Sequence, residues 1–101
     1  MSAENNLSHR QLAMYMTARE LHDLPMGDEP GYHSKEQLVK EKLQESKDSG
    51  LYTDIKNKGV DTPVDIHNDD DGQYLWDGHH RVVSANKINP SMLIPVEHHE
   101  Y

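Results

Sequence analysis

The sequence contains no cysteine and no phenylalanine, and it has one tryptophan among its 101 residues. Without cysteine there is no disulfide, no thiolate metal site and no cysteine nucleophile. Because aromatic side chains are few, the core has to come from Leu, Ile, Val and Met together with the five tyrosines. A chain of this length predicts one domain of modest stability, to which a bound ligand or partner would add.

Long apolar runs and a basic leader are also missing. No apolar run approaches the roughly 20 residues that cross a membrane. Residues 1–6 lack the basic and apolar regions of a secretory signal peptide. These absences predict a cytoplasmic protein that does not enter a membrane.

Basic residues are few, with ten Lys and Arg against eighteen Asp and Glu and a formal charge of −8. Affinity for nucleic acid comes largely from cationic side chains that displace counterions, so direct DNA binding is not expected. The imbalance is strongest between Lys58 and Arg81, where there are six aspartates and no intervening Lys or Arg. This acidic stretch fits a solvated hairpin rim, a Mg²⁺-assisted phosphate site or a surface for a basic partner, and all three stay open.

Local patterns in the first third of the chain predict short elements around an irregular loop. Residues 12–16 are apolar and favour a buried strand, although a helix that begins at Ser8 competes with it. Thr17 and Glu20 form a capping pattern for a short helical turn. The prolines and glycines of residues 25–31 predict the loop.

Helices and strands alternate in the rest of the chain. Ser34 and Gln37 supply a second capping pattern, and Gly50 and Gly59 each end a helical segment. The predicted elements are a helix from Ser34 to about Lys47, a helix over 51–57, strands over 63–67 and 73–76, a helix from His79 or His80 to Ile88, and a strand over 92–97. This order predicts a compact α+β single domain with a small mixed sheet.

The most informative stretch is the run Asp77-Gly78-His79-His80-Arg81, which joins a strand end, a glycine turn and a helix start. Glycine lets the backbone turn sharply and approach a ligand closely. The first turn of the helix presents unpaired N–H groups and the positive end of the helix dipole. Such a corner suits a phosphate, with Arg81 as a bidentate clamp and His80 beside it. The alternative is a plain strand-to-helix turn with solvated polar side chains.

This run, with Tyr-Leu-Trp at 74–76 and Leu-Ile-Pro-Val at 93–96, resembles the ParB/sulfiredoxin superfamily. Members include CTP-binding partition proteins, ATP-using sulfiredoxins, ADP-dependent free-serine kinases and proteins labelled ParB-like nucleases. A Gly-x-x-Arg box at this place binds nucleotide phosphates in the superfamily. The resemblance therefore implies a ParB/sulfiredoxin-like fold that binds ATP, ADP or CTP, with or without Mg²⁺. The implied nucleotide-binding residues are Asp77, Gly78, His79, His80 and Arg81.

The resemblance also divides the chain. It implies a polar N-terminal segment over 1–11, a ParB/sulfiredoxin-like domain over 12–98 and a C-terminal tail over 99–101. The DNA-binding region of partition proteins and the longer carboxy-terminal half of the serine kinases have no counterpart here. The chain resembles the stripped-down modules found alone in phage and mobile-element genomes. Sulfiredoxin chemistry is excluded, because His79 stands where the catalytic cysteine would be.

The stretch Glu-Gln-Leu-Val at 36–39 is similar to one in the free-serine kinases, where the glutamate is the base toward the substrate hydroxyl. The resemblance implies Glu36 as the catalytic base of a small phosphotransferase or phosphohydrolase, facing the same cleft as His80 and Arg81. The alternative for Glu36 is a plain glutamate of the first helical turn, stabilised by the helix dipole.

Two classes of function follow. The first is a stand-alone domain that binds a nucleotide or another phosphorylated molecule, with or without catalysis. The second is a non-catalytic acidic interaction protein, a phage-type modulator that offers its Asp-rich face to a basic host protein. A nuclease is disfavoured, because the basic track that it needs is absent.

The histidines do not show the spacing of a metal site. The sequence has eight of them, including the adjacent pairs His79/His80 and His98/His99. Adjacent residues on one element point in different directions, and His-x-His and His-x₃-His spacings are absent. We therefore predict no metal site, and we expect His98 and His99 to be exposed tail residues.

Overall fold

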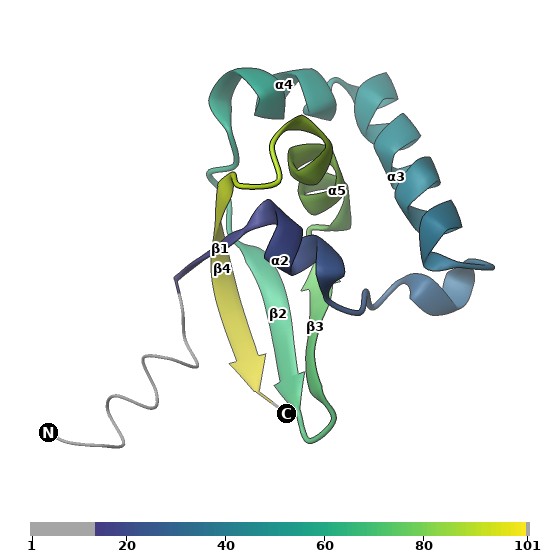
Figure 1. The fold of residues 1–101 in the computed structure, drawn as a ribbon, viewed down its shortest axis with the longest axis vertical. Helices are drawn as coiled ribbons and strands as arrows, with labels where there is room; N and C mark the ends of the chain where they lie inside the picture. Colours follow the sequence, from purple (N-terminus) through teal and green to yellow (C-terminus); the bar gives the residue numbers. More distant parts are fainter. Residues whose placement is uncertain (1–13, 101) are drawn as a thin grey trace, which may run out of the picture.

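A computed structural model describes residues 14–100, in which four helices gather beside one four-stranded sheet (Figure 1). This arrangement confirms the predicted α+β class and the small mixed sheet. The elements are β1 (Tyr15–Thr17), α2 (Ala18–Asp23), a 3-10 turn (Glu29–Gly31), α3 (Lys35–Ser49), α4 (Leu51–Lys58), β2 (Val64–Asp69), β3 (Gly72–Asp77), α5 (His79–Ile88) and β4 (Leu93–Glu100).

The strand order of the sheet is β1-β4-β2-β3. β4 pairs antiparallel with β1 and parallel with β2, and β2 and β3 form an antiparallel hairpin. The outer edge of β3 is covered by the loop after α2, since Gly27 donates to the carbonyl of Leu75 and Leu75 donates to that of Pro25, each at 2.8 Å. Pairing of this kind protects a sheet edge from other chains.

Both predicted caps are present. The amide of Glu20 donates to Thr17 Oγ1 at 3.1 Å, and the amide of Thr17 donates to the Glu20 carboxylate at 2.9 Å, which completes a capping box at the start of α2. At α3 the amide of Gln37 donates to Ser34 Oγ at 3.1 Å. The Gln37 side chain accepts from the amide of His33, one residue before the cap, at 2.7 Å. These local signals fix where the two helices begin.

The structure differs from the predicted boundaries at the two ends. The first strand is Tyr15–Thr17, while residues 12–13 and the alternative helix from Ser8 lie outside the described residues. β4 continues to Glu100, so the expectation that His98 and His99 are tail residues is wrong. The parallel pairing with β2 extends to Glu100 and supplies hydrogen-bond partners to these polar residues, which the local sequence pattern cannot reveal.

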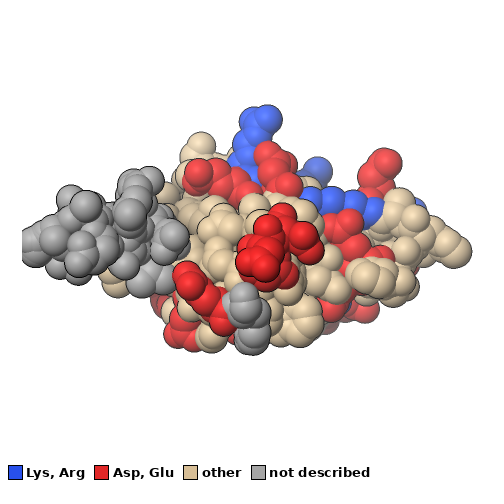
Figure 2. Space-filling view, turned by 90° about the horizontal axis from the view of Figure 1, so that it is seen from below, with Lys and Arg blue, Asp and Glu red and all other residues tan. Residues whose placement is uncertain are grey.

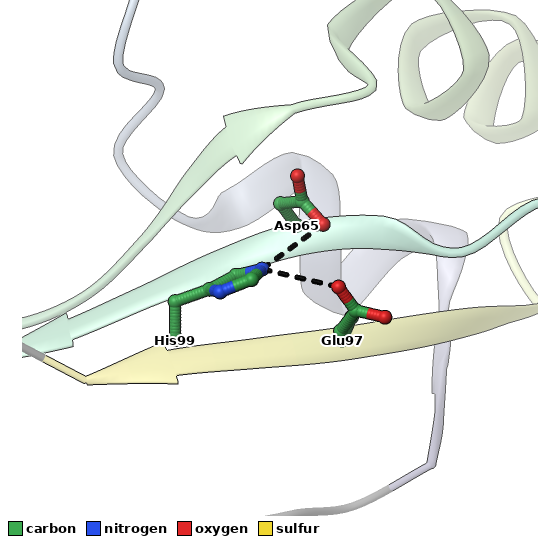
Figure 3. Close-up of side chains that lie close together, drawn as sticks. All are labelled: Asp65, Glu97 and His99. Carbon is green, nitrogen blue, oxygen red and sulfur yellow. Dashed lines mark hydrogen bonds and ion pairs between the residues drawn. The ribbon is translucent and has the colours of Figure 1, made fainter.

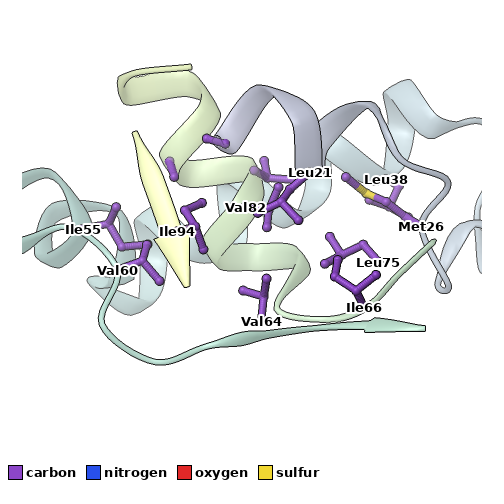
Figure 4. Packing of buried hydrophobic residues seen from close by; sticks show 13 residues of the cluster. Leu21, Met26, Leu38, Ile55, Val60, Val64, Ile66, Leu75, Val82 and Ile94 are labelled. Carbon is purple, nitrogen blue, oxygen red and sulfur yellow. The ribbon is translucent and has the colours of Figure 1, made fainter. Parts of the chain in front are cut away.

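The core lies between the sheet and the helices, with α5 in contact with α2, α3 and α4 (Figure 4). Side chains alternate along β2, so that Val64 and Ile66 are fully buried, while Asp65 and His67 belong to the opposite face of the sheet. None of the helices in residues 14–100 is both long and apolar enough to cross a membrane. The buried side chains shown are Leu21, Met26, Leu38, Ile55, Val60, Val64, Ile66, Leu75, Val82 and Ile94 together with three further core residues.

Candidate functional site

The predicted glycine corner is present. β3 ends at Asp77, Gly78 has a φ of +101°, and α5 begins at His79. A Cβ on Gly78 would lie 2.5 Å from Val64 Cγ1, far inside van der Waals contact. Both the positive φ and the lack of space restrict this position to glycine.

The amino terminus of α5 is open. The amide of Val82 is the first to bond within the helix, to the carbonyl of Gly78 at 2.9 Å. Among the described residues, no side chain caps the amides before it. Because the first turn of a helix has no backbone acceptors of its own, these N–H groups are available to an anion.

A pocket of about 510 Å³ lies at this corner, which is within the range of roughly 300–1,000 Å³ that small-molecule sites occupy. The five residues predicted to bind a nucleotide all line it, so the fold brings them together. The remaining lining residues come from α3, the start of α4 and the loop after α2. In full, the pocket is lined by Asp28, Lys42, Glu45, Ser49, Leu51, Asp77, Gly78, His79, His80 and Arg81.

Arg81 is anchored beside the pocket. Its Nη1 donates to the carbonyls of Thr62 and Pro63 at 2.6 and 3.1 Å. Its Nη2 lies 3.3 Å from the position that a Cβ on Gly78 would take, so the guanidinium covers the corner. Within residues 14–100 the Nη2 and Nε groups make no hydrogen bond, and they keep donors for a ligand.

His80 pairs with a carboxylate across the pocket. Its Nε2 lies 2.7 Å from Glu45 Oε1 on α3. The two side chains are 40% and 57% exposed, so water screens this pair. The contact ties the first turn of α5 to the middle of α3.

His79 is buried rather than solvated, with 5% of its surface exposed. Its Nδ1 lies 3.6 Å from Asp28 Oδ2, and the same oxygen lies 3.0 Å from Lys42 Nζ. Burial lowers the pKa of His79, although Asp28 acts in the opposite direction. The hydrogen bond from Lys42 lowers the pKa of Asp28. Burial is the largest single influence on Lys42 and would lower its pKa, but the hydrogen bond and charge of Asp28 together with Tyr32 outweigh it, and the pKa is raised.

Asp28, Lys42 and Glu45 were not predicted from the sequence. Lys42 occupies the buried stripe of α3 between Leu38 and Ser46, both of which are fully buried. A lysine at the core position of an amphipathic helix requires a partner. This position is the feature of the sequence that could have marked Lys42 as a site residue. Asp28 lies in an irregular loop, where no periodicity marks it.

The structure does not bring Glu36 to this pocket. Glu36 lines a separate surface hollow with His22 and Val39. It lies nine residues before Glu45, which puts the two roughly 180° apart around α3. The expected shared cleft is therefore not formed, because the buried residues of α3 fix its rotation and turn Glu36 away. The position of Glu36 gives no support to its role as a base.

The buried His79 and the partly buried His22 predict a loss of stability on mild acidification. Burial lowers the pKa of both His79 and His22 below the ordinary value of 6.5. The unfolded chain therefore takes up protons before the folded chain as the pH falls through 6.5, and the free energy of unfolding decreases. The slope is at most about 1.4 kcal/mol per pH unit for each histidine.

Urea unfolding at intervals from pH 7.5 to 5.0 measures this slope. We expect His79→Gln to be less stable at pH 7.5 but to show a shallower pH dependence than the wild type. The matched control is His33→Gln, because His33 is exposed in the loop before α3. Equal slopes for all three proteins would contradict the assignment to His79.

Comparison of the chain with protein-family models, curated proteins and solved structures gives no match. The resemblance to the ParB/sulfiredoxin superfamily therefore rests on the motif residues alone and stays a prediction. The geometry around Gly78 is the structural feature that supports a site.

Proposed function

We propose that the pocket at the amino terminus of α5 binds the phosphate of a nucleotide or of another small phosphorylated molecule. The main support is the geometry at Gly78, a position that only glycine fits. It immediately precedes α5, whose first amides have no side-chain cap within residues 14–100. Arg81 covers that corner with unused guanidinium donors. Backbone amides and an arginine are the groups that hold phosphate in proteins.

The acidic lining of the pocket determines which form of the ligand fits. Asp28, Glu45 and Asp77 line it, and the first two already pair with Lys42 and His80. A bare polyphosphate would be repelled by these carboxylates. A nucleotide that carries Mg²⁺ offsets that repulsion, because carboxylates are preferred Mg²⁺ ligands. We therefore expect binding to be stronger with Mg²⁺ present.

A thermal-shift screen with ATP, ADP, CTP and GTP, each with and without Mg²⁺, tests the proposal. A ligand that binds only the native state raises the midpoint of unfolding by mass action. A rise for at least one nucleotide is the expected result. No rise for any of them at millimolar concentration would refute nucleotide binding.

Replacing Arg81 with alanine should weaken nucleotide affinity roughly ten- to a hundredfold. The change removes charge-assisted hydrogen bonds worth about 1.5–3 kcal/mol. Isothermal titration calorimetry on the folded variant measures the effect. The control is Arg19→Ala, because Arg19 is an exposed arginine of α2 whose ion pair within residues 14–100 is with Asp23 at 3.9 Å. Equal affinities for wild type and Arg81→Ala would exclude a phosphate at this corner.

A second candidate is an acidic surface for a basic protein. Figure 2 looks onto the end of the molecule that carries the β2–β3 turn, and acidic side chains gather in its middle while Lys and Arg lie along the upper rim. The turn residues Asp69, Asp70 and Asp71 belong to this end. A surface of one charge sign speeds encounter with an oppositely charged partner. A protein that binds none of the tested nucleotides would favour this candidate.

A further inference from the structure

We propose a binding site for one transition-series divalent cation, with Zn²⁺ as the best fit, formed by Asp65, Glu97 and His99 (Figure 3). Asp65 lies on β2, and Glu97 and His99 lie two residues apart on β4. The parallel register pairs Asp65 with Glu97, and His99 is opposite His67. Alternation along both strands therefore puts the three side chains on one face, opposite the face that carries the core.

The distances match those between ligands of one metal ion. His99 Nε2 lies 3.3 Å from Asp65 Oδ1 and 3.3 Å from Glu97 Oε1. All three ligand atoms lie within 4.8 Å of one another. A tetrahedral Zn²⁺ with bonds of about 2.0–2.1 Å separates its ligands by about 3.3–3.4 Å. The side chains would thus need little movement to bind an ion.

Hydrogen bonding alone explains this arrangement less well. The single Nε2–H of His99 can serve both carboxylates only as a shared, bifurcated donor, and 3.3 Å is longer than the roughly 2.7–2.9 Å of a charge-assisted hydrogen bond. A divalent cation beside Asp65 and Glu97 would balance the negative charge of the two carboxylates. A cation between the three groups satisfies both the geometry and the charge.

The ligand types select the class of ion. Imidazole nitrogen favours Zn²⁺, Co²⁺ and Ni²⁺, whereas Mg²⁺ and Ca²⁺ prefer sites made only of oxygen. The side chains of Asp65, Glu97 and His99 are 31%, 62% and 37% exposed, so solvent reaches the group. Three protein ligands with an accessible fourth position leave room for water or for an anionic ligand.

Metal titration of chelator-treated protein tests the site. We expect one Zn²⁺ per chain to bind in competition with a chelating dye, and His99→Gln to weaken this binding by at least roughly tenfold, since even loss of an outer-shell partner costs about 10–100-fold. The matched control is His98→Gln, because His98 is the next residue of β4 and its ring lies 3.2 Å from the side-chain amide of Asn68. This control should retain wild-type affinity.

The single tryptophan supplies an independent readout. The Trp76 ring stacks on His67 at 4.5 Å between centroids, and the His67 ring lies 5.6 Å from that of His99. Co²⁺ or Ni²⁺ bound at the proposed site should therefore quench tryptophan fluorescence in the wild type and in His98→Gln, but not in His99→Gln. Bound Co²⁺ should also give the intense visible absorption of a four-coordinate site.

Asp65→Asn provides a second variant in case His99→Gln fails to fold, which circular dichroism would show. Equal metal affinity in wild type, His98→Gln and His99→Gln would overturn the proposal. So would a wild type that binds Zn²⁺ no more tightly than Mg²⁺. The α5 pocket shares no residue with this group, so either site can fail without the other.

Discussion

Gly78→Ala is expected to lower the free energy of unfolding by about 2–5 kcal/mol. A φ of +101° costs a residue with a Cβ about 1–2 kcal/mol. The new methyl group would also lie 2.5 Å from Val64 Cγ1 and 2.8 Å from Val64 Cβ, which forces β2 and the start of α5 apart. Overpacking of this kind adds about 1–3 kcal/mol. Urea unfolding of the wild type and the variant measures the difference.

Gly50→Ala is the matched control for Gly78→Ala. Gly50 has a φ of +88° at the junction of α3 and α4, and among residues 14–100 no atom outside Gly50 and its chain neighbours lies within 4 Å of the position of its Cβ. Only the backbone term applies, so we expect a loss of about 1–2 kcal/mol. If both variants lose the same stability, the close approach of the new methyl group to Val64 adds no cost. Lack of space would then not restrict position 78 to glycine.

Asp28→Ala is expected to cost about 2–3 kcal/mol, the second largest effect. The change leaves the Lys42 ammonium, whose side chain is 11% exposed, without its carboxylate partner at 3.0 Å. An unpaired charge inside a protein costs more than the hydrogen bond that it has lost. The half-exposed position of Asp28 lets water reach part of the group and keeps the loss below that of a fully buried pair.

Asp23→Ala tests whether the stability loss expected for Asp28→Ala comes from the burial of Lys42. Asp23 pairs with Arg19 at 3.9 Å, and both side chains are largely exposed. Exposed pairs at this helical spacing contribute about 0.3–0.5 kcal/mol. Chemical unfolding should therefore separate the two variants clearly. Comparable losses for Asp28→Ala and Asp23→Ala would mean that Lys42 is solvated after the substitution.

Elements marked by local chemistry were predictable from the sequence. The hydroxyls of Thr17 and Ser34 accept hydrogen bonds from the helix amides as the capping patterns predict. Gly50 and Gly78 stand where a left-handed backbone ends one element and starts the next. Each of these features depends on residues within a few positions of one another, which a single sequence displays directly.

Features that depend on long-range packing were not predictable in this way. Burial of His79 requires Asp28 and Lys42, which lie on two other segments. The group around His99 requires the parallel register of β2 and β4, since Asp65 is 34 positions from His99. Spacing along the chain therefore missed a cluster of two carboxylates and an imidazole that the sheet assembles.

The lack of support for Glu36 has the same origin. The motif at 36–39 correctly lies at the start of a helix. That helix is α3, which begins at Lys35, one residue before Glu36. The rotation of that helix depends on which of its side chains the core accepts, and this is decided by α5, to which α3 packs. A local motif fixes the element but not the direction in which its side chains point.

The position of β4 in the sheet bears on how the chain folds during its synthesis. β4 follows all the other strands in the sequence but lies between β1 and β2, so the inner edges of β1 and β2 have no strand to pair with until Leu93–Glu100 have left the ribosome. Because synthesis adds about 5–20 residues per second, the inner edges of β1 and β2 stay unpaired for several seconds. Until β4 pairs with both neighbours, the nascent chain carries unpaired strand edges of the kind that make folding intermediates prone to aggregate.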